Sequence, residues 1–330
     1  MMLCRPFTTA VILPLVAAIA IGHGAAAQSA TATPLATPPA QTPSPPAAPA
    51  TMPDAPLPTA EELFAKQAAA CGGDEAFAKI ESMTSKATMK MPATNLNGTI
   101  VSHFAVAPAH GKDAGNVAGN GRFVVLMNLP GIGDVRTGFD GTVGWSTDKV
   151  LGPRLLEGKE LEQIKTDSDF RRELSLHKKF DSATVAALTT WAEKPAYEVR
   201  LKGQSGDPQR EMTVYLDQAT SLLIGMKMLA QTPSGAVPIE TTVSEYRAYE
   251  GPAGKIMLPA KTTLVWLGQK QILEVEEVDF DPIDPTVFEL PEAIKALVKA
   301  RDSAPPKPEA PANPAKAPAD TPSPTKTNIP

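Results

Sequence analysis

Few residues of this chain have the type and spacing that catalysis needs. After residue 27 the only histidines are His103, His110 and His177. None of them belongs to an H-E-x-x-H pattern, and the chain contains no C-x-x-C, G-x-S-x-G or P-loop pattern. The segment Gly203-Gln204-Ser205-Gly206 lacks the esterase spacing and predicts a hairpin turn instead. We therefore predict no catalytic residue, no metal site and no cofactor.

The densest group of carboxylates is the one remaining candidate for reaction chemistry. It comprises Glu274, Glu276, Glu277, Asp279 and Asp281. Paired carboxylates can bind Ca²⁺ or hydrolyse a glycoside. A charged, solvated strand edge is the commoner use of such a run, and it also discourages aggregation. We favour the strand edge over the catalytic site.

Composition excludes several classes of protein. The formal net charge is −5, whereas nucleic-acid binding needs a basic surface, so no nucleic-acid partner is expected. Two cysteines, Cys4 and Cys71, cannot build a disulfide scaffold. If the chain is cleaved after Ala27, Cys71 alone remains, and it is expected to be a small buried hydrophobic residue.

The two ends of the chain differ from its middle. Residues 1–27 have an apolar run too short for a membrane span and end in Ala25-Ala26-Ala27, which predicts a secretory signal peptide; an uncleaved anchor is the alternative. Of the 34 prolines, ten lie in 28–58 and nine in 302–330. Such segments have too little apolar bulk to fold. We predict a Pro/Ala-rich disordered linker at 28–58, a domain at 59–296, and a disordered tail at 297–330.

The middle alternates with a period of two after a short helical start. Thr59 and Glu62 form a capping-box pattern for a helix that runs to Cys71, and a second short helix is expected over 75–80. Residues 85–91 then alternate small or apolar with polar residues, which indicates a half-buried strand. Similar patterns predict strands near 100–106, 123–129, 134–139, 142–148, 183–191, 196–202, 210–216, 221–230, 237–248, 256–267 and 270–280.

The connections predict how these strands pair. Most are short and rich in Gly, Asp, Asn or Pro, whereas a parallel pair needs a crossover of about a dozen residues or more. The sheet should therefore be antiparallel, with neighbours in sequence paired. Residues 158–179 differ, because Leu161 with Ile164 and Phe170 with Leu174 have helical spacing. We expect a helical insertion there that covers one face of the sheet as a lid.

Several turn motifs resemble those of a known family. Gly138-Phe139-Asp140-Gly141 followed by Trp145, and Tyr215-Leu216-Asp217 followed by Thr220, are similar to hairpins of bacterial lipoprotein-sorting proteins. A later Tyr246…Gly254…Leu258-Pro259 pattern and the closing segment 281–291 resemble theirs in the same order. The chain thus resembles the LolA/LolB-like superfamily over most of 60–291. The resemblance implies a mainly β (α+β) fold, in which a curved antiparallel sheet forms an incomplete β-barrel with N-terminal helices.

The resemblance also implies a non-enzymatic carrier of acyl chains. An acyl chain needs a dry, deformable lining, and methionine suits irregular shapes, although ordinary core packing is the commoner role for such residues. Met89 with Met91 and Met226 with Met228 form same-face pairs. The expected lid residues are Leu161, Ile164, Phe170 and Leu174. The expected apolar lining is Met89, Met91, Ile100, Phe104, Phe123, Val125, Met127, Ile224, Met226, Met228, Leu264 and Trp266.

Three functions remain open from the sequence. The first is a binding protein for lipid or lipoprotein acyl chains in the periplasm of a Gram-negative-type bacterium. The second is an envelope interaction module whose barrel docks a protein and is tethered by the Pro-rich arms, which are also candidate contacts for other envelope proteins. The third, which we expect least, is a hydrolase of envelope polymers.

Overall fold

The computed structural model describes residues 56–106, 121–149, 151–168, 177, 180–203, 211–232 and 235–303. The predicted signal peptide, most of the predicted linker, the chain after Ser303, and the expected lid residues Phe170 and Leu174 lie outside these ranges. No helix within them has the length and apolar character needed to cross a membrane.

Thirteen strands make up most of the described chain. The first six are β1 (Ser82–Met91), β2 (Leu96–Val106), β3 (Gly121–Leu129), β4 (Gly133–Phe139), β5 (Gly144–Asp148) and β6 (Gly152–Leu156). The other seven are β7 (Ser182–Trp191), β8 (Lys194–Lys202), β9 (Glu211–Asp217), β10 (Leu223–Thr232), β11 (Gly235–Gly251), β12 (Gly254–Trp266) and β13 (Gln269–Asp279). All the predicted strands are present, and only β6 has no counterpart among them.

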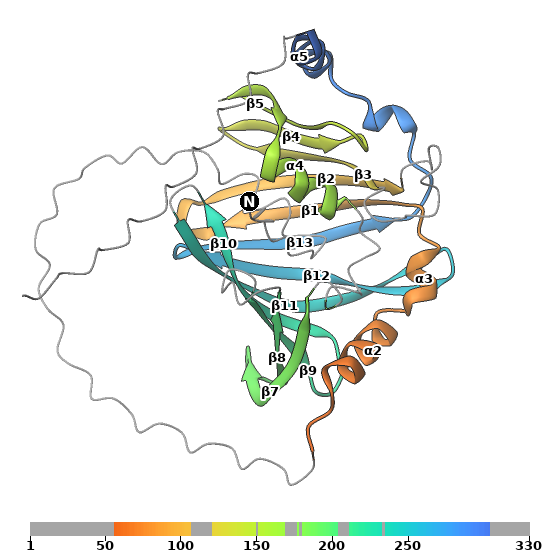
Figure 1. Ribbon diagram of the computed structural model, residues 1–330, viewed down its shortest axis with the longest axis vertical. Coiled ribbons are helices and arrows are strands. Elements are labelled where there is room, and N and C mark those ends of the chain that lie inside the picture. Colours follow the sequence, from red (N-terminus) through yellow and green to blue (C-terminus); the bar gives the residue numbers. More distant parts are fainter. Residues whose placement is uncertain are drawn as a thin grey trace, which may run out of the picture.

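The strands form one antiparallel sheet that does not close. Its order is β6-β5-β4-β3-β2-β1-β13-β12-β11-β10-β9-β8-β7, so every pair joins sequence neighbours except β1 with β13. Along the chain, the strands therefore run from β1 in the middle of the sheet to the edge strand β6. The chain then crosses to the opposite edge strand β7 and returns to the middle, where β13 pairs with β1. Figure 1 shows the sheet curving between these two edges, with β7, β8 and β9 turned across the direction of β1 to β4. The predicted mainly β, curved, open architecture is confirmed.

The two main turn motifs have a direct structural basis. Asp140 Oδ1 accepts hydrogen bonds from the backbone N–H groups of Thr142 and Val143, both at 2.7 Å, which shapes the β4–β5 hairpin. Asp217 Oδ1 accepts from the backbone N–H and the hydroxyl of Thr220, at 2.7 and 2.8 Å, in the β9–β10 turn. The short aspartate side chain replaces a backbone acceptor in each turn.

Along the chain, helices precede the first strand, interrupt the strands between β6 and β7, and follow the last strand. Helix α2 (Ala60–Ala70) begins with the predicted capping box, in which Thr59 and Glu62 each accept a hydrogen bond from the other's backbone N–H. Helix α3 (Asp74–Ala78) follows it, and α4 (Gly158–Asp167) lies in the connection from β6 to β7. Short 3₁₀ turns are η1 (Pro92–Thr94) and η6 (Pro285–Phe288). Helix α5 (Glu292–Ser303) continues beyond residue 296, where the sequence predicts the domain to end.

The sheet has two distinct faces. We call the face that carries Met89, Phe123 and Met226 the inner face, because α2, α3 and α4 pack against it. On the outer face, η6 and α5 cover β3 to β6 through a cluster that includes Trp145, Phe288 and Ile294. Figure 1 shows α4 over the sheet near β2 and β3, with α2 and α3 beside the end of β11 and β12 and α5 beyond β5.

Candidate functional site

The inner face carries a large apolar cluster, which we call cluster A, over β1 to β4, with further residues from β6, β12 and β13. Its rows follow the antiparallel register, in which directly paired residues share a face. One row pairs Met83 with Phe104, Phe104 with Phe123, and Phe123 with Phe139. Cluster A contains all seven lining residues that the sequence predicts on these strands: Met89, Met91, Ile100, Phe104, Phe123, Val125 and Met127. Six of them are buried and Met91 is partly buried, so the structure brings this part of the predicted lining together.

A second apolar cluster, cluster B, covers the inner face of β8, β9 and β10. The predicted residues Met226 and Met228 belong to it, together with Val199, Leu201 and Met212 of the neighbouring strands. Helix α2 packs on cluster B through Ala60, Leu63 and Phe64. The predicted N-terminal helix therefore covers one end of the inner face, while α3 covers part of cluster A through Ala76 and Phe77.

Helix α4 places the two described lid residues on cluster A. Ile164 is buried there and Leu161 is partly buried. A Cβ on Gly144 of β5 would lie 3.0 Å from the end of the Leu161 side chain, so the glycine leaves the space that Leu161 fills. Arg154 of β6 holds α4 from the edge of the sheet through two hydrogen bonds to Glu160, at 2.8 and 3.2 Å. The start of the insertion thus covers the inner face as expected.

The same insertion reaches the far end of the inner face. His177 stacks on Phe64 of α2, with ring centroids 4.3 Å apart and an interplanar angle of 9°. His177 therefore packs against an apolar side chain of α2. The β6–β7 connection therefore contacts both cluster A and the helix that covers cluster B.

Ile224 lies apart from the other predicted lining residues. It belongs to an outer-face cluster with Trp191, Ala196 and Tyr215, whereas Met226 lies on the inner face. The cause is a bulge between Leu223 and Gly225, where the pairing of β10 with β9 slips by one residue. A bulge interrupts the alternation of side chains, so the period of two that places Ile224 beside Met226 does not apply there.

One part of the inner face of β11, β12 and β13 is polar, although other residues of β12 and β13 belong to cluster A. The predicted lining residue Leu264 is buried here, directly opposite Thr241 on one side and Gln271 on the other. The half-buried Trp266 lies at the end of β12, opposite Gln269. Sequence reasoning missed Thr241, Thr262 and Gln271, which are 2%, 3% and 4% exposed. Their burial depends on long-range register, and no local motif signals it.

The residues considered for reaction chemistry lie elsewhere. His103 is on β2, where Thr84 Oγ1 lies 3.1 Å from its Nδ1; burial, and to a lesser extent the Arg136 charge, lower the pKa of this histidine. Its row pairs with Val124 of the outer face. His110 lies outside the described residues.

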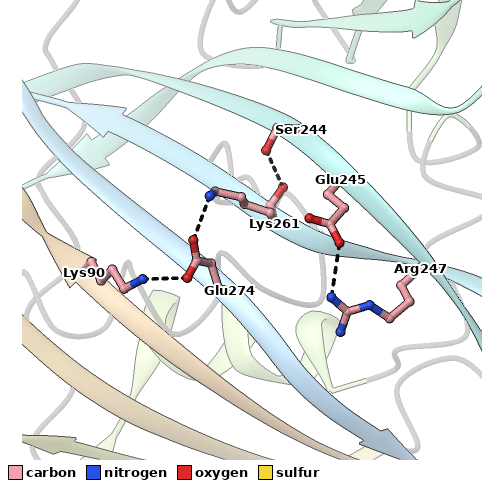
Figure 2. A network of polar contacts seen from close by, with 6 residues as sticks. All are labelled: Lys90, Ser244, Glu245, Arg247, Lys261 and Glu274. Atoms are coloured by element: carbon pink, nitrogen blue, oxygen red, sulfur yellow. Dashed lines mark hydrogen bonds and ion pairs between the residues drawn. The ribbon is translucent and has the colours of Figure 1, made fainter.

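The acidic run is paired with lysines across the outer face. Glu274 contacts Lys90 and Lys261, each at 2.7 Å (Figure 2). Glu277 contacts Lys86 at 2.6 Å. Strand β13 lies inside the sheet between β1 and β12, which corrects the expectation of a strand edge. Within the described part of the chain, no three His, Cys, Asp or Glu side chains are placed to share a metal ion.

Comparison with protein-family models and with curated proteins finds no match. Among solved structures, a DUF1329 family protein from Desulfovibrio piger is 10% identical, with coverage of 69% of this chain and 96% of its own and a TM-score of 0.46. A LolA superfamily protein from Nitrosomonas europaea is 11% identical, with coverage of 71% and 99% and a TM-score of 0.42. A Vibrio parahaemolyticus domain described as an outer membrane lipoprotein-sorting protein is 12% identical, with coverage of 72% and 97% and a TM-score of 0.43.

Proposed function

We propose that this chain is a non-enzymatic binding protein of the bacterial envelope, located in the periplasm, that holds lipid or lipoprotein acyl chains on the inner face of its sheet. The observation that carries the proposal is the pair of apolar clusters on one face of an open sheet. Cluster A extends from β4 to β12 and cluster B covers β8 to β10, under three helices that come from two different parts of the chain.

The chemistry of the inner face suits an acyl chain. The row from Met83 through Phe104 and Phe123 to Phe139 contains no charged residue, and neither does the row from Val199 through Val214 to Met226. Burying an isolated charge is costly, so a face without charge favours apolar ligands over ionic ones. Five methionines of the two clusters, Met83, Met89, Met127, Met212 and Met226, are buried and have unbranched side chains that adapt to different ligand shapes.

The arrangement of the chain also suits ligand exchange. The residues that cover the inner face belong to α2, α3 and the β6–β7 connection, and none of these segments is a strand of the sheet. A cover that is not part of the sheet can move without breaking the strand ladder. Movement of α4 would expose cluster A, and movement of α2 would expose cluster B.

Binding is tested directly by titration. The protein expressed from residue 28 onward is stripped of lipid and titrated with a fluorescent C16 fatty acid and with a diacylated lipopeptide. Saturable binding that unlabelled lipopeptide displaces is expected. Lack of saturable binding to both probes would contradict the proposed function. Mass spectrometry of lipid that co-purifies with the native protein then identifies the ligand.

A further inference from the structure

Buried polar atoms without a partner gather at one place on the inner face. Thr241 Oγ1, Thr262 Oγ1 and Gln271 Oε1 have no hydrogen-bond partner, although their side chains are almost completely buried. Trp266 Nε1 and Gln269 Oε1, on the adjoining β12–β13 hairpin, have none either. We call these five residues the polar strip.

The register places the polar strip on three adjacent strands. Thr241 of β11 and Gln271 of β13 both lie opposite Leu264 of β12, so two strand spacings, about 10 Å, separate their backbones. Thr262 lies two residues before Leu264 on the same strand and therefore on the same face. Cluster B begins at Met226, which pairs with Thr241, and cluster A begins at Met89, which touches Gln271. At this level of the sheet the strip therefore lies between Met89 of cluster A and Met226 of cluster B, while further along β12 and β13 cluster A continues through Leu258 and Leu273.

The protein itself leaves these groups unsatisfied. Native structures leave few buried polar atoms unpaired, because such an atom loses its hydrogen bonds to water and gains nothing in return. Gln271 Nε2 donates to the Met89 sulfur at 2.6 Å, and a thioether is only a weak acceptor. Valine in place of either threonine would keep the shape without this cost. The strip is therefore explained if a bound molecule supplies the partners.

The strip also defines what that molecule must offer. Two hydroxyls and one indole N–H can donate hydrogen bonds, while two amide oxygens can accept them. None of the five residues is charged. An ester carbonyl fits the donors, and an amide N–H or a hydroxyl fits the acceptors. A free carboxylate or a phosphate would instead call for a cation, and this strip supplies none.

We infer that the polar strip binds the uncharged junction of a lipid with more than one acyl chain, through its ester carbonyls and an amide or hydroxyl group. Chains that leave such a junction in two directions would lie against clusters A and B. The inference rests on the proposed function, because it assigns the polar part of the ligand to the same face. It adds that chains without the junction bind more weakly.

The test compares two lipopeptides that differ only at the junction. One carries two ester-linked acyl chains, and the other carries the same chains through ether bonds, which lack carbonyl oxygens. Each displaces a fluorescent fatty acid from the wild type and from the double variant Thr241→Val/Thr262→Val. We expect the ester form to bind the wild type at least tenfold more tightly than the ether form. The double variant should lose about tenfold in ester affinity per hydroxyl and leave ether affinity unchanged.

A neighbouring threonine provides the matched control. Thr263 lies between Thr262 and Leu264 but faces the other side of the sheet, so Thr263→Val should change neither affinity. Equal binding of the ester and ether forms by the wild type would overturn the polar strip while leaving acyl binding intact. Binding of neither form would contradict the proposed function itself. Denaturation without ligand gives a second readout, and a marked loss of stability in the double variant would show that the hydroxyls already have partners.

Discussion

Glu274 and Lys261 face each other on neighbouring strands β13 and β12, with carboxylate and ammonium 2.7 Å apart (Figure 2). Lys90 of β1 approaches the same carboxylate from the opposite side, also at 2.7 Å. Hydrogen bonds from Lys261 and Lys90 lower the pKa of Glu274 from 4.5 to about 2. One carboxylate therefore links β1, β13 and β12 on the outer face, where the two halves of the sheet meet.

This pairing predicts acid sensitivity. Because the pKa of Glu274 is lower in the folded state, its contribution to stability is complete above about pH 4.5 and is lost as the pH falls toward 2. Replacing Glu274 with Gln should lower stability at pH 7 and reduce the difference between pH 7 and pH 3. Urea denaturation at both values measures this. The exposed Glu276→Gln provides the control, and an identical pH difference in wild type and Glu274→Gln would contradict the prediction.

The packing of α4 on cluster A predicts that truncating Ile164 destabilises this helix and leaves the sheet intact. Ile164 is the buried residue by which α4 packs on cluster A, so Ile164→Ala should release α4 while the sheet stays folded. The expected cost of this truncation is about 2 kcal/mol or more, concentrated in the helix. Hydrogen exchange should accelerate over 158–167 and stay unchanged in β1 to β3. The exposed Glu157→Gln serves as the control, and equal protection of α4 in wild type and Ile164→Ala would contradict the packing role.

The close packing of Gly225 against Trp191 on the outer face predicts that a side chain at position 225 destabilises the protein. A Cβ at this position would lie 2.2 Å from the Trp191 indole ring, which stacks on Tyr215 at 4.0 Å. A rigid ring cannot yield as the end of a flexible chain does, so Gly225→Ala should destabilise the protein by about 1–3 kcal/mol. Thermal denaturation measures this. Adding Trp191→Leu should recover part of the loss, whereas strictly additive losses in the double variant would contradict the contact.

The sequence predicts the sheet well because its signals are local. Alternation along β1 to β3 and the turns at Asp140 and Asp217 depend on a few neighbouring residues, and the structure retains them. Strand β6 is missed because Gly152-Pro153 is typical of a loop and the strand has only five residues. Its role becomes visible only through Arg154, which contacts Glu160 of α4.

The candidate site is harder to predict because it depends on register. The period of two pairs Met89 with Met91 and Met226 with Met228, and all four lie on the inner face. It fails at Ile224, where a bulge changes the face. The polar strip has no local signal at all. Thr241, Thr262 and Gln271 come together only because three strands pair in one particular register.

Met226 provides the sharpest test of the apolar lining. It is 2% exposed in cluster B and pairs with Val214 and Thr241, so Met226→Asp places a carboxylate among apolar side chains. An unpaired buried charge costs several kcal/mol, and the acyl ligand would have to share that environment. We expect affinity for the fluorescent fatty acid to fall at least tenfold in protein that circular dichroism shows to be folded.

Two control variants distinguish loss of a ligand contact at Met226 from a general disturbance of the fold. Met226→Leu keeps an apolar side chain of similar volume and should bind within a few-fold of the wild type. Met257→Asp places the same charge on β12 at a half-buried position next to Leu258, on the other face of the strand, and should leave affinity unchanged. If folded Met226→Asp binds as tightly as wild type, Met226 does not line the site and the ligand must lie over cluster A alone. Equal losses in Met226→Asp and Met257→Asp would instead show that the charge acts through the fold, because only one of the two residues faces cluster B.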